Sequence, residues 1–217
     1  MKKALIICLA ILVCFGFVAC KEEPHQHSAS EDSVIYCADG KLYNVCGTCN
    51  EKMDTESILE PYTIKTIKIA DDVTSIGDAA FDNCKAITSI SIPNSVTSIG
   101  SSVFASCESL TSITIPDSVT SMGPYNFESC YNLESVTLSN NLKSLEAANF
   151  FKCSKLVSIT IPVSVTSINK SAFNSSGIKT VNYPGTKAQW DLIGLDLTNL
   201  PGAKLEKIIC SDDEITV

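Results

Sequence analysis

The cysteines are the residues of this sequence whose type and spacing come closest to a chemical site. Cys46 and Cys49 form a CxxC motif, and Cys37 lies upstream of it. A redox CxxC needs a helix amino terminus that lowers the pKa of one thiol, and a structural zinc ion takes four ligands. The motif here follows a strand-like run, and only three cysteines lie in this segment. We therefore expect a structural disulfide or free thiols; a redox site, or a zinc site completed by Cys210 or a histidine, is the alternative.

Other residue types give little support for catalysis or for nucleic-acid binding. No histidine follows His27, so a Ser-His-Asp arrangement would have to draw on the polar amino-terminal segment that holds His25 and His27. No Gly-rich phosphate loop follows a strand-like run. The net charge is −8 and all 16 basic residues are lysine, whereas nucleic-acid and phosphate sites depend on arginine forks and basic patches. We expect no enzymatic activity, no cofactor, no metal site and no nucleic-acid partner.

Most of the chain is a repeat with a period of 23 residues. Phenylalanine recurs at this step at Phe81, Phe104, Phe127, Phe150 and Phe173. Cysteine follows three residues behind at Cys84, Cys107, Cys130 and Cys153. A fixed period of this length is the signature of a solenoid, in which successive turns stack and bury a common core.

One turn of the expected coil is residues 110–132. Apolar and hydroxyl-bearing residues alternate over 110–115, which is the pattern of a half-buried strand. Pro116 has no amide hydrogen and fixes φ, so it ends the strand and begins a turn. Phe127 and Cys130 are three residues apart, which predicts a short helical turn on the opposite side. Seven apolar positions in each turn must point inward, and stacking buries them at ~1.5–3 kcal/mol for each large side chain.

The cysteine column predicts buried free thiols. Cysteines on successive turns would lie ~4.8 Å apart, but parallel Cβ vectors aim their sulfur atoms poorly for a disulfide. A buried cysteine packs well as a small hydrophobic residue. We place the turns at 64–86, 87–109, 110–132, 133–155 and 156–177, followed by a last strand that starts one residue early near Gly177. The fourth turn has Asn140-Asn141 at the proline turn, where we expect looser structure.

The two ends of the repeat array carry sequences that differ from the repeat. An atypical terminal unit is expected, because each end of a solenoid exposes its core. At the amino end, residues 34–63 form the predicted cap, with a hairpin signal at Asp39-Gly40. At the other end, residues 185–217 form the predicted carboxy-terminal cap. Five apolar residues are expected to cover the core there: Trp190, Leu192, Ile193, Leu195 and Leu197.

The run L-x-x-I-x-I-P-x-x-V-x-x-I-G-x-x-x-F-x-x-C resembles the BspA-like, Treponema pallidum-type leucine-rich repeat. The resemblance covers residues 64–184, and residues 183–190 with Cys210-Ser211-Asp212 are similar to the family's closing segment. It implies an α/β solenoid, a right-handed coil with a parallel β-sheet on one face and short helical or 3-10 turns opposite. It also implies a bacterial cell-envelope setting, with adhesion or host-protein binding in some members.

The amino terminus resembles a bacterial lipoprotein signal. Lys2 and Lys3 precede an apolar run over 4–18 that is too short to span a bilayer comfortably, and Ala19-Cys20 ends it. The resemblance implies cleavage after residue 19 and a diacylglycerol on the sulfur of Cys20. Residues 20–33 lack apolar periodicity and predict a flexible tether. We expect a lipid-anchored protein in the cell envelope, at the surface; an ordinary cleaved signal or an uncleaved anchor is the alternative.

The outward residues of the strands are the candidate binding face. One column consists of Lys68, Ser91, Thr114, Thr137, Thr160 and Asn182. The next consists of Thr66, Ser89, Ser112, Ser135, Ser158 and Thr180. We expect a flat, hydroxyl-rich surface, which either recognises a ligand or only suits strand structure. Tyr125, Tyr131 and Phe151 interrupt the pattern of small or polar residues and are candidate aromatic contacts.

The sequence therefore predicts a membrane-anchored binding or adhesion module for a protein or glycan ligand. Two alternatives remain. The same lipid could hold a structural scaffold that faces the periplasm. In the other alternative, the protein uses Cys37, Cys46 and Cys49 for redox or metal chemistry.

Overall fold

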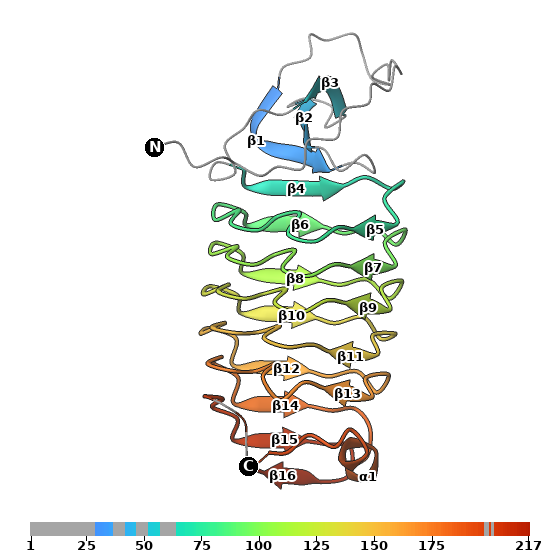
Figure 1. Cartoon of the computed structure of the whole chain (residues 1–217), viewed down its shortest axis with the longest axis vertical. Coiled ribbons are helices and arrows are strands. Elements are labelled where there is room, and N and C mark those ends of the chain that lie inside the picture. The colour runs from blue at the N-terminus through green and yellow to red at the C-terminus, as the bar shows by residue number, and fades with distance from the viewer. Residues whose placement is uncertain (1–28, 37–41, 47–51, 57–63, 198–199, 201) are drawn as a thin grey trace.

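A computed structural model describes residues 29–36, 42–46, 52–56, 64–197, 200 and 202–217. Within these ranges the chain winds into a stack of turns, with the amino-terminal strands at one end and the carboxy terminus at the other (Figure 1). The predicted signal, Cys20, both histidines, Cys37 and Cys49 lie outside the described residues.

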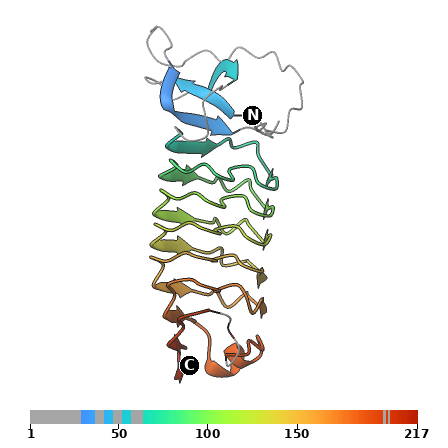
Figure 2. The same ribbon diagram turned by 60° about the vertical axis from the view of Figure 1, so that its left-hand side comes forward.

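One strand from each turn lies in a column on one side of the stack, which we call the strand face (Figures 1 and 2). Its members are β4 (Thr66–Ile69), β6 (Ser89–Ser91), β8 (Ser112–Thr114), β10 (Ser135–Thr137), β12 (Ser158–Thr160), β14 (Thr180–Asn182) and β15 (Lys207–Ile209). Thr66 pairs with Ser89 and Ser112 with Ser135, in parallel and at the predicted step. Ser158 pairs with Thr180, one residue early as predicted. A Cβ at the nearby Gly177 would collide with the carbonyl oxygen of Ser154, which explains a glycine there.

The strand column is not one continuous sheet. β4 bonds to β6, β8 to β10, and β12 to β14 and then β15, but β6 and β8 are not hydrogen-bonded neighbours, and neither are β10 and β12. Neither break in the ladder has a signal in the repeat sequence.

A second column of parallel strands forms one corner of each turn. It comprises β5 (Ser75–Ile76), β7 (Ser98–Ile99), β9 (Ser121–Met122), β11 (Ser144–Leu145) and β13 (Ser167–Ile168). The amide of Thr97 donates to the carbonyl of Thr74 at 2.9 Å, and that of Thr120 to Thr97 at 3.0 Å. The sequence analysis did not predict this column, because two residues are too few to show strand alternation.

The predicted helical turns opposite the strand face are barely supported: they are single hydrogen-bonded turns, such as the one closed by the amide of Cys130 donating to the carbonyl of Phe127 at 3.2 Å. α1 (Lys187–Asp191), in the carboxy-terminal cap, is the only helix in the part of the chain that the structure describes. In the third turn Tyr125 and Ser129 have φ of 62° and 59°, and left-handed residues recur in the other turns. The amide of Ser129 donates to the carbonyl of Phe151 on the next turn at 2.8 Å. The backbone therefore bonds between turns, and left-handed residues interrupt any helix.

The interior is a column of stacked phenylalanine rings. The Phe104 and Phe127 centroids are 5.5 Å apart, and those of Phe127 and Phe150 are 5.6 Å apart. All five repeat phenylalanines are buried, and so are the seven predicted core positions of the third turn: Leu110, Ile113, Ile115, Val119, Met122, Phe127 and Cys130. The prediction that stacking hides these positions is confirmed.

The cysteine column consists of free, buried thiols, as predicted. The thiol of Cys130 donates to the carbonyl of Phe104 at 3.1 Å, and that of Cys153 to Phe127 at 3.0 Å. Burial raises the pKa of Cys130 to about 12. These thiols are therefore protonated at neutral pH, and those of Cys107, Cys130 and Cys153 each donate to a carbonyl of the preceding turn.

The proline-free turn of the fourth repeat is well bonded, so the expected looseness is wrong. The buried hydroxyl of Ser139 donates to the carbonyl of Val119 at 2.6 Å. The side-chain amide of Asn141 donates to the carbonyl of Asp117 at 2.8 Å. These two side-chain bonds fix a backbone that proline fixes in other repeats.

The strands before the repeats extend the strand face by pairing. β1 (Ala29–Tyr36) is antiparallel to β2 (Leu42–Cys46), which confirms the predicted hairpin, and parallel to β4. β3 (Lys52–Glu56) pairs with β2. β1 begins at Ala29, inside the segment that the sequence analysis assigned to the tether.

The carboxy-terminal cap covers the last turn, but not all five of the predicted apolar residues contribute to it. Trp190 is buried, and its ring meets that of Tyr183 edge-on at 5.2 Å. Leu192 is 84% exposed, so its predicted role in covering the core is wrong. α1 ends there and the residue lies on its outer side. Ile193, Leu195 and Leu197 are partly buried and pack against the core, and β16 (Glu214–Thr216) closes the sheet, antiparallel to β15.

Candidate functional site

The predicted outward residues do lie on the outer surface of the strand face. Strand alternation sends Ile67, Ile113 and Ile159 inward and leaves their neighbours in solvent. Ten of the twelve outward residues are exposed: Thr66, Lys68, Ser89, Ser91, Ser112, Thr114, Ser135, Thr137, Ser158 and Thr160. Thr180 and Asn182, on the last repeat strand, are half-buried. The structure thus places the candidate residues where a ligand could reach them.

The strand face carries a shallow, open trough at β6, β8 and β10. A trough of about 760 Å³ lies across the break between β6 and β8. Five of the predicted face residues line it: Ser89, Ser91, Ser112, Thr114 and Thr137. Its other lining residues come from the inward positions of the strands and from the turns that follow them.

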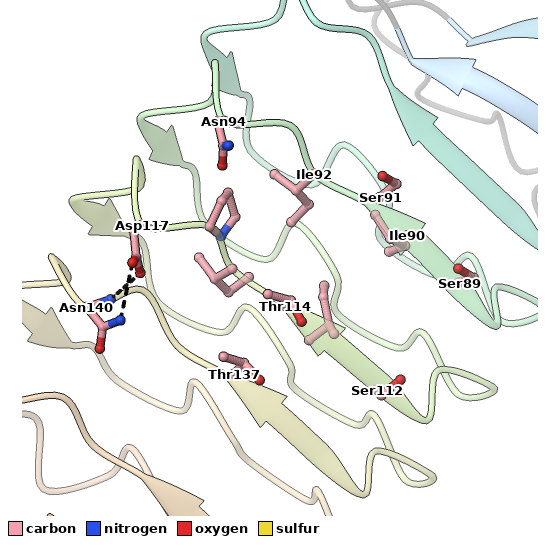
Figure 3. Close-up of a pocket in the computed structure, with 13 residues that line it drawn as sticks. Ser89, Ile90, Ser91, Ile92, Asn94, Ser112, Thr114, Asp117, Thr137 and Asn140 are labelled. Atoms are coloured by element: carbon pink, nitrogen blue, oxygen red, sulfur yellow. Dashed lines mark hydrogen bonds between the residues drawn. The ribbon is translucent and has the colours of Figure 1, made fainter. Parts of the chain in front are cut away.

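A row of hydroxyl residues runs along the trough; we call it the hydroxyl wall and define it as Ser91, Thr114 and Thr137, with Ser89 and Ser112 lying beyond it (Figure 3). These residues come from three successive turns. Their side-chain hydroxyls make no hydrogen bond to any residue that the structure describes. A hydroxyl both donates and accepts hydrogen bonds, so the wall has unused capacity of both kinds.

The opposite side is an amide–acid wall, which we define as Asn94, Asp117 and Asn140 (Figure 3). One carboxylate oxygen of Asp117 accepts from the backbone amide of Asn140 at 2.8 Å, and the other from its side-chain amide at 3.2 Å. These two bonds, the backbone one first, lower the pKa of Asp117. The carboxylate is therefore ionised at neutral pH. The side chain of Asn94 has no hydrogen-bond partner among the described residues.

The sequence analysis missed the amide–acid wall. Asn94, Asp117 and Asn140 each follow the proline position of their turn, and residues of these types are common in turns whatever their function. The sequence signal that could have identified these residues is their recurrence at the same step as the residues of the hydroxyl wall. In each turn, the hydroxyl residue is the last of the strand and the amide or acid follows it.

The floor of the trough is aliphatic. Ile92 lies between the two walls, and in the next turn Ile115 and Pro116 connect Thr114 to Asp117 along the chain (Figure 3). Ile92 and Pro116 are partly exposed, whereas Ile115 is almost fully buried. The lining therefore combines an apolar base with two polar edges.

The two walls span three turns. In the turn before them, the equivalent positions are Lys68 and Asp71, both charged and exposed. In the turn after them, Thr160 continues the hydroxyl column, but Val163 stands at the amide–acid position and is 55% exposed. The trough thus has a definite length along the coil.

The candidate aromatic contacts lie outside the trough lining. Tyr125 and Tyr131 are 43% and 41% exposed. Phe151 is half-buried, and the ammonium group of Lys152 lies 5.0 Å from its ring centroid. The structure brings none of the three to the strand-face trough, so they form no common site with the hydroxyl wall.

The described cysteines are poorly suited to redox or metal chemistry. Burial raises the pKa of Cys84 to about 12 and holds that of Cys107 well above its ordinary value. A nucleophile or metal ligand must be a thiolate, and these thiols stay protonated. Across the described ranges, no three metal-ligating side chains form a group. Of the three cysteines in the redox or metal hypothesis, Cys37 and Cys49 lie outside the described residues, and only Cys46 lies within them.

No helix within the described part of the chain has the length and apolar character to cross a bilayer. That finding concerns residue ranges that begin after the apolar amino-terminal run.

Comparison with known proteins matches the repeats to one family. The family of the BspA type leucine rich repeat region matches residues 55–179 in six copies. A leucine-rich repeat protein from T. pallidum is similar in structure, with a TM-score of 0.54, 22% identity, and coverage of 75% of this chain and 71% of that one. No curated protein matches the chain.

Two other similar structures are bacterial. A leucine rich cell surface protein from Faecalibacterium prausnitzii has 22% identity and a TM-score of 0.48, with 70% of this chain and 55% of that one covered. A leucine-rich repeat protein from Bacteroides ovatus has 24% identity and a TM-score of 0.40, with coverage of 69% and 56%. The present chain thus spans little more than half the length of these two proteins.

Proposed function

Because the chain belongs to the BspA-type leucine-rich repeat family, we propose that it is a binding module whose strand face holds a protein or glycan ligand. The proposal includes its setting: a lipid on Cys20 anchors the module to the bacterial cell envelope, at the cell surface. Binding, and not catalysis, is the activity proposed.

The observation that carries this proposal is the trough between the two walls. Hydroxyls that only kept strands soluble would need no hollow, and a hollow with an aliphatic floor is where a ligand could leave water. The hydroxyl wall has no partners among the described residues, so its bonding capacity is available to a ligand. A solenoid holds such groups rigidly, so little conformational entropy is lost when they bind.

The proposed anchor is supported by the amino-terminal sequence. Cys20 ends an apolar run and is followed by the polar residues Lys21, Glu22 and Glu23. Buried lipid methylenes contribute ~0.8 kcal/mol each, and several chains together give stable attachment. The residues between Cys20 and β1 would then separate the repeats from the membrane.

Protease treatment of intact cells that express the full chain tests the proposed location. We expect the repeats to be cleaved from untreated cells, and Cys20→Ala to release the protein from the membrane fraction. Complete protection in intact cells, with cleavage after the outer membrane is opened, would favour the scaffold that faces the periplasm.

Capture of immobilised host matrix proteins and glycans by the purified full chain tests the proposed binding face. Thr114→Arg places a long charged side chain in the trough and is expected to abolish capture. Thr160→Arg, on the same column beyond the trough, is the matched control and should retain it. Loss of capture only in the Tyr131→Ser/Phe151→Ser variant would instead place the contact on the aromatic residues.

A further inference from the structure

We propose that the trough binds a neutral, linear glycan that lies parallel to the coil axis, with about one sugar unit per turn. This inference rests on the proposed function and names the ligand class of the same site. It follows from the direction of the walls, from the chemistry of the lining and from the positions where the walls end.

The direction of the trough favours a chain that crosses the strands. Each wall takes one residue from each of three successive turns, so both walls run along the stack (Figure 3). Hydrogen-bonded strands such as β8 and β10 are about 4.8 Å apart, which is close to the length of one pyranose unit in an extended glycan. Successive sugars would therefore meet equivalent side chains on successive turns.

The lining matches the two kinds of surface on a sugar ring. Equatorial hydroxyls lie around the edge of a pyranose ring, and its C–H bonds form an apolar face. The hydroxyl wall and the amide–acid wall can bond the edges, while Ile92 and Pro116 lie where the C–H face would rest. The ionised carboxylate of Asp117 would accept from a sugar hydroxyl, and a charged acceptor strengthens such a bond.

The charge of the site selects a neutral glycan. The lining has no cationic side chain, and its one charged residue is Asp117. The whole chain carries a net charge of −8. An acidic polysaccharide would meet repulsion from both, so uronic acids and sulfated sugars are expected to bind poorly.

A peptide fits the same trough less well. An extended peptide on a sheet gains most from backbone bonds to a strand edge, but the trough crosses the strands and both its walls consist of side chains. A peptide lying there would lose water from its backbone groups without regular partners for them. A sugar hydroxyl can both donate and accept a hydrogen bond, so it does not need the regular partners that peptide backbone groups need.

The ends of the walls predict the length of the bound segment. Lys68 replaces the hydroxyl residue in the turn before the trough, and Val163 interrupts the amide–acid wall in the turn after it. Three turns lie between them. We therefore expect about three or four sugars to make all the available contacts.

Calorimetric titration of the purified full chain with β-1,4-linked gluco-oligosaccharides of two to six units tests this inference. We expect affinity to rise up to about four sugars and then to change less than about twofold. The α-1,4-linked series, which curls instead of extending, and a β-1,4-linked series that carries carboxylates should both bind more weakly.

Matched variants identify the site in the same titration. Asn94→Leu and Thr114→Val each remove hydrogen-bonding groups that have no described partner in the protein, and each should weaken binding about three- to tenfold. Thr160→Val removes a hydroxyl beyond the trough and should change affinity less than about twofold. Thermal unfolding of every variant verifies that the fold is retained.

The outcomes separate this inference from the proposed function. If no oligosaccharide binds, or if binding is unaffected by Asn94→Leu and Thr114→Val, the glycan assignment is wrong. Capture of a host matrix protein that is lost in Thr114→Arg would then leave the proposed function standing with a protein ligand. If neither glycans nor matrix proteins bind through the trough, both proposals fail.

Discussion

Threonine hydroxyls have opposite roles in two columns of this coil. Next to the second strand column, Thr97 donates its hydroxyl to the carbonyl of Thr74 at 3.1 Å, and Thr166 donates to Lys143 at 3.3 Å. On the strand face, the hydroxyls of Thr114 and Thr137 have no partner among the described residues. The same residue type at the same period thus links turns in one column and faces solvent in the other.

This difference between the two columns separates repeat residues that the fold itself explains from those that it does not. A residue that bonds the preceding turn is explained by the fold, whatever else it does. The cysteine thiols, which bond phenylalanine carbonyls, belong to this class. The hydroxyl wall needs another explanation, because the fold can form without its hydroxyls.

The largest loss of stability is expected from Phe127→Ala. The ring is fully buried at the centre of the five-ring column, and truncating a buried phenylalanine costs ~3–5 kcal/mol. Urea unfolding of the full chain measures the effect. Tyr131→Ala, which shortens an exposed aromatic residue in the same turn, is the control and should cost less than ~0.5 kcal/mol. Similar losses for the two variants would contradict the stacked interior.

Asn126→Ala is expected to have the next largest effect. This buried side chain donates to the carbonyls of Gly100 and Gly123, both at 2.8 Å, and accepts from the amide of Val103 at 3.2 Å. Its removal leaves buried backbone groups unpaired, at a cost of ~1–3 kcal/mol. Urea unfolding measures it, and a change below ~0.5 kcal/mol would show that water replaces these bonds.

A smaller loss of folding stability is expected when the pH is raised, because the buried thiols ionise more readily in the unfolded chain. The pKa of Cys130 is about 12 in the folded protein against an ordinary 9.0, so its stabilising contribution is complete below pH 9 and is lost as pH rises towards 12. The unfolded thiol ionises first, which costs ~1.4 kcal/mol of stability by pH 10. The loss between pH 7 and pH 10 should therefore be smaller by that amount in Cys130→Ala. Equal losses in the two proteins would mean that this thiol ionises in the fold.

The sequence allowed the strand face and the interior to be predicted because both have strong periodic signals. Ile113 and Ile115 alternate with hydroxyl residues, the phenylalanine at Phe127 recurs in all five turns, and the cysteine at Cys130 recurs in the first four. The second strand column was missed because two residues per strand leave no alternation to detect. The left-handed turns were missed because Ala79, Ser102 and Tyr125 share a conformation but no residue type.

The trough was harder to predict than the fold. Its hydroxyl wall was on the predicted face, but the trough lies across the break in pairing between β6 and β8. Strands of similar sequence pair at β8 and β10 and not at β6 and β8, so the repeat sequence does not reveal the break. Asn94 and Asp117 are turn residues by type, and only their position in space makes them one side of a site.

The smallest effect, and the most direct test of the comparison, is expected from Thr97→Val and Thr114→Val. Valine keeps the shape of threonine and removes only the hydroxyl. Thr97→Val deletes a bond to the carbonyl of Thr74 and should cost ~1 kcal/mol in urea unfolding. Thr114→Val deletes a hydroxyl without a described partner, and valine suits a strand, so stability should change by less than ~0.5 kcal/mol. Binding through the trough should respond in the opposite order, with Thr97→Val neutral and Thr114→Val weakened. If both variants changed stability alike and neither changed binding, the hydroxyls of the two columns would have one role, and the strand face would need no ligand to explain it.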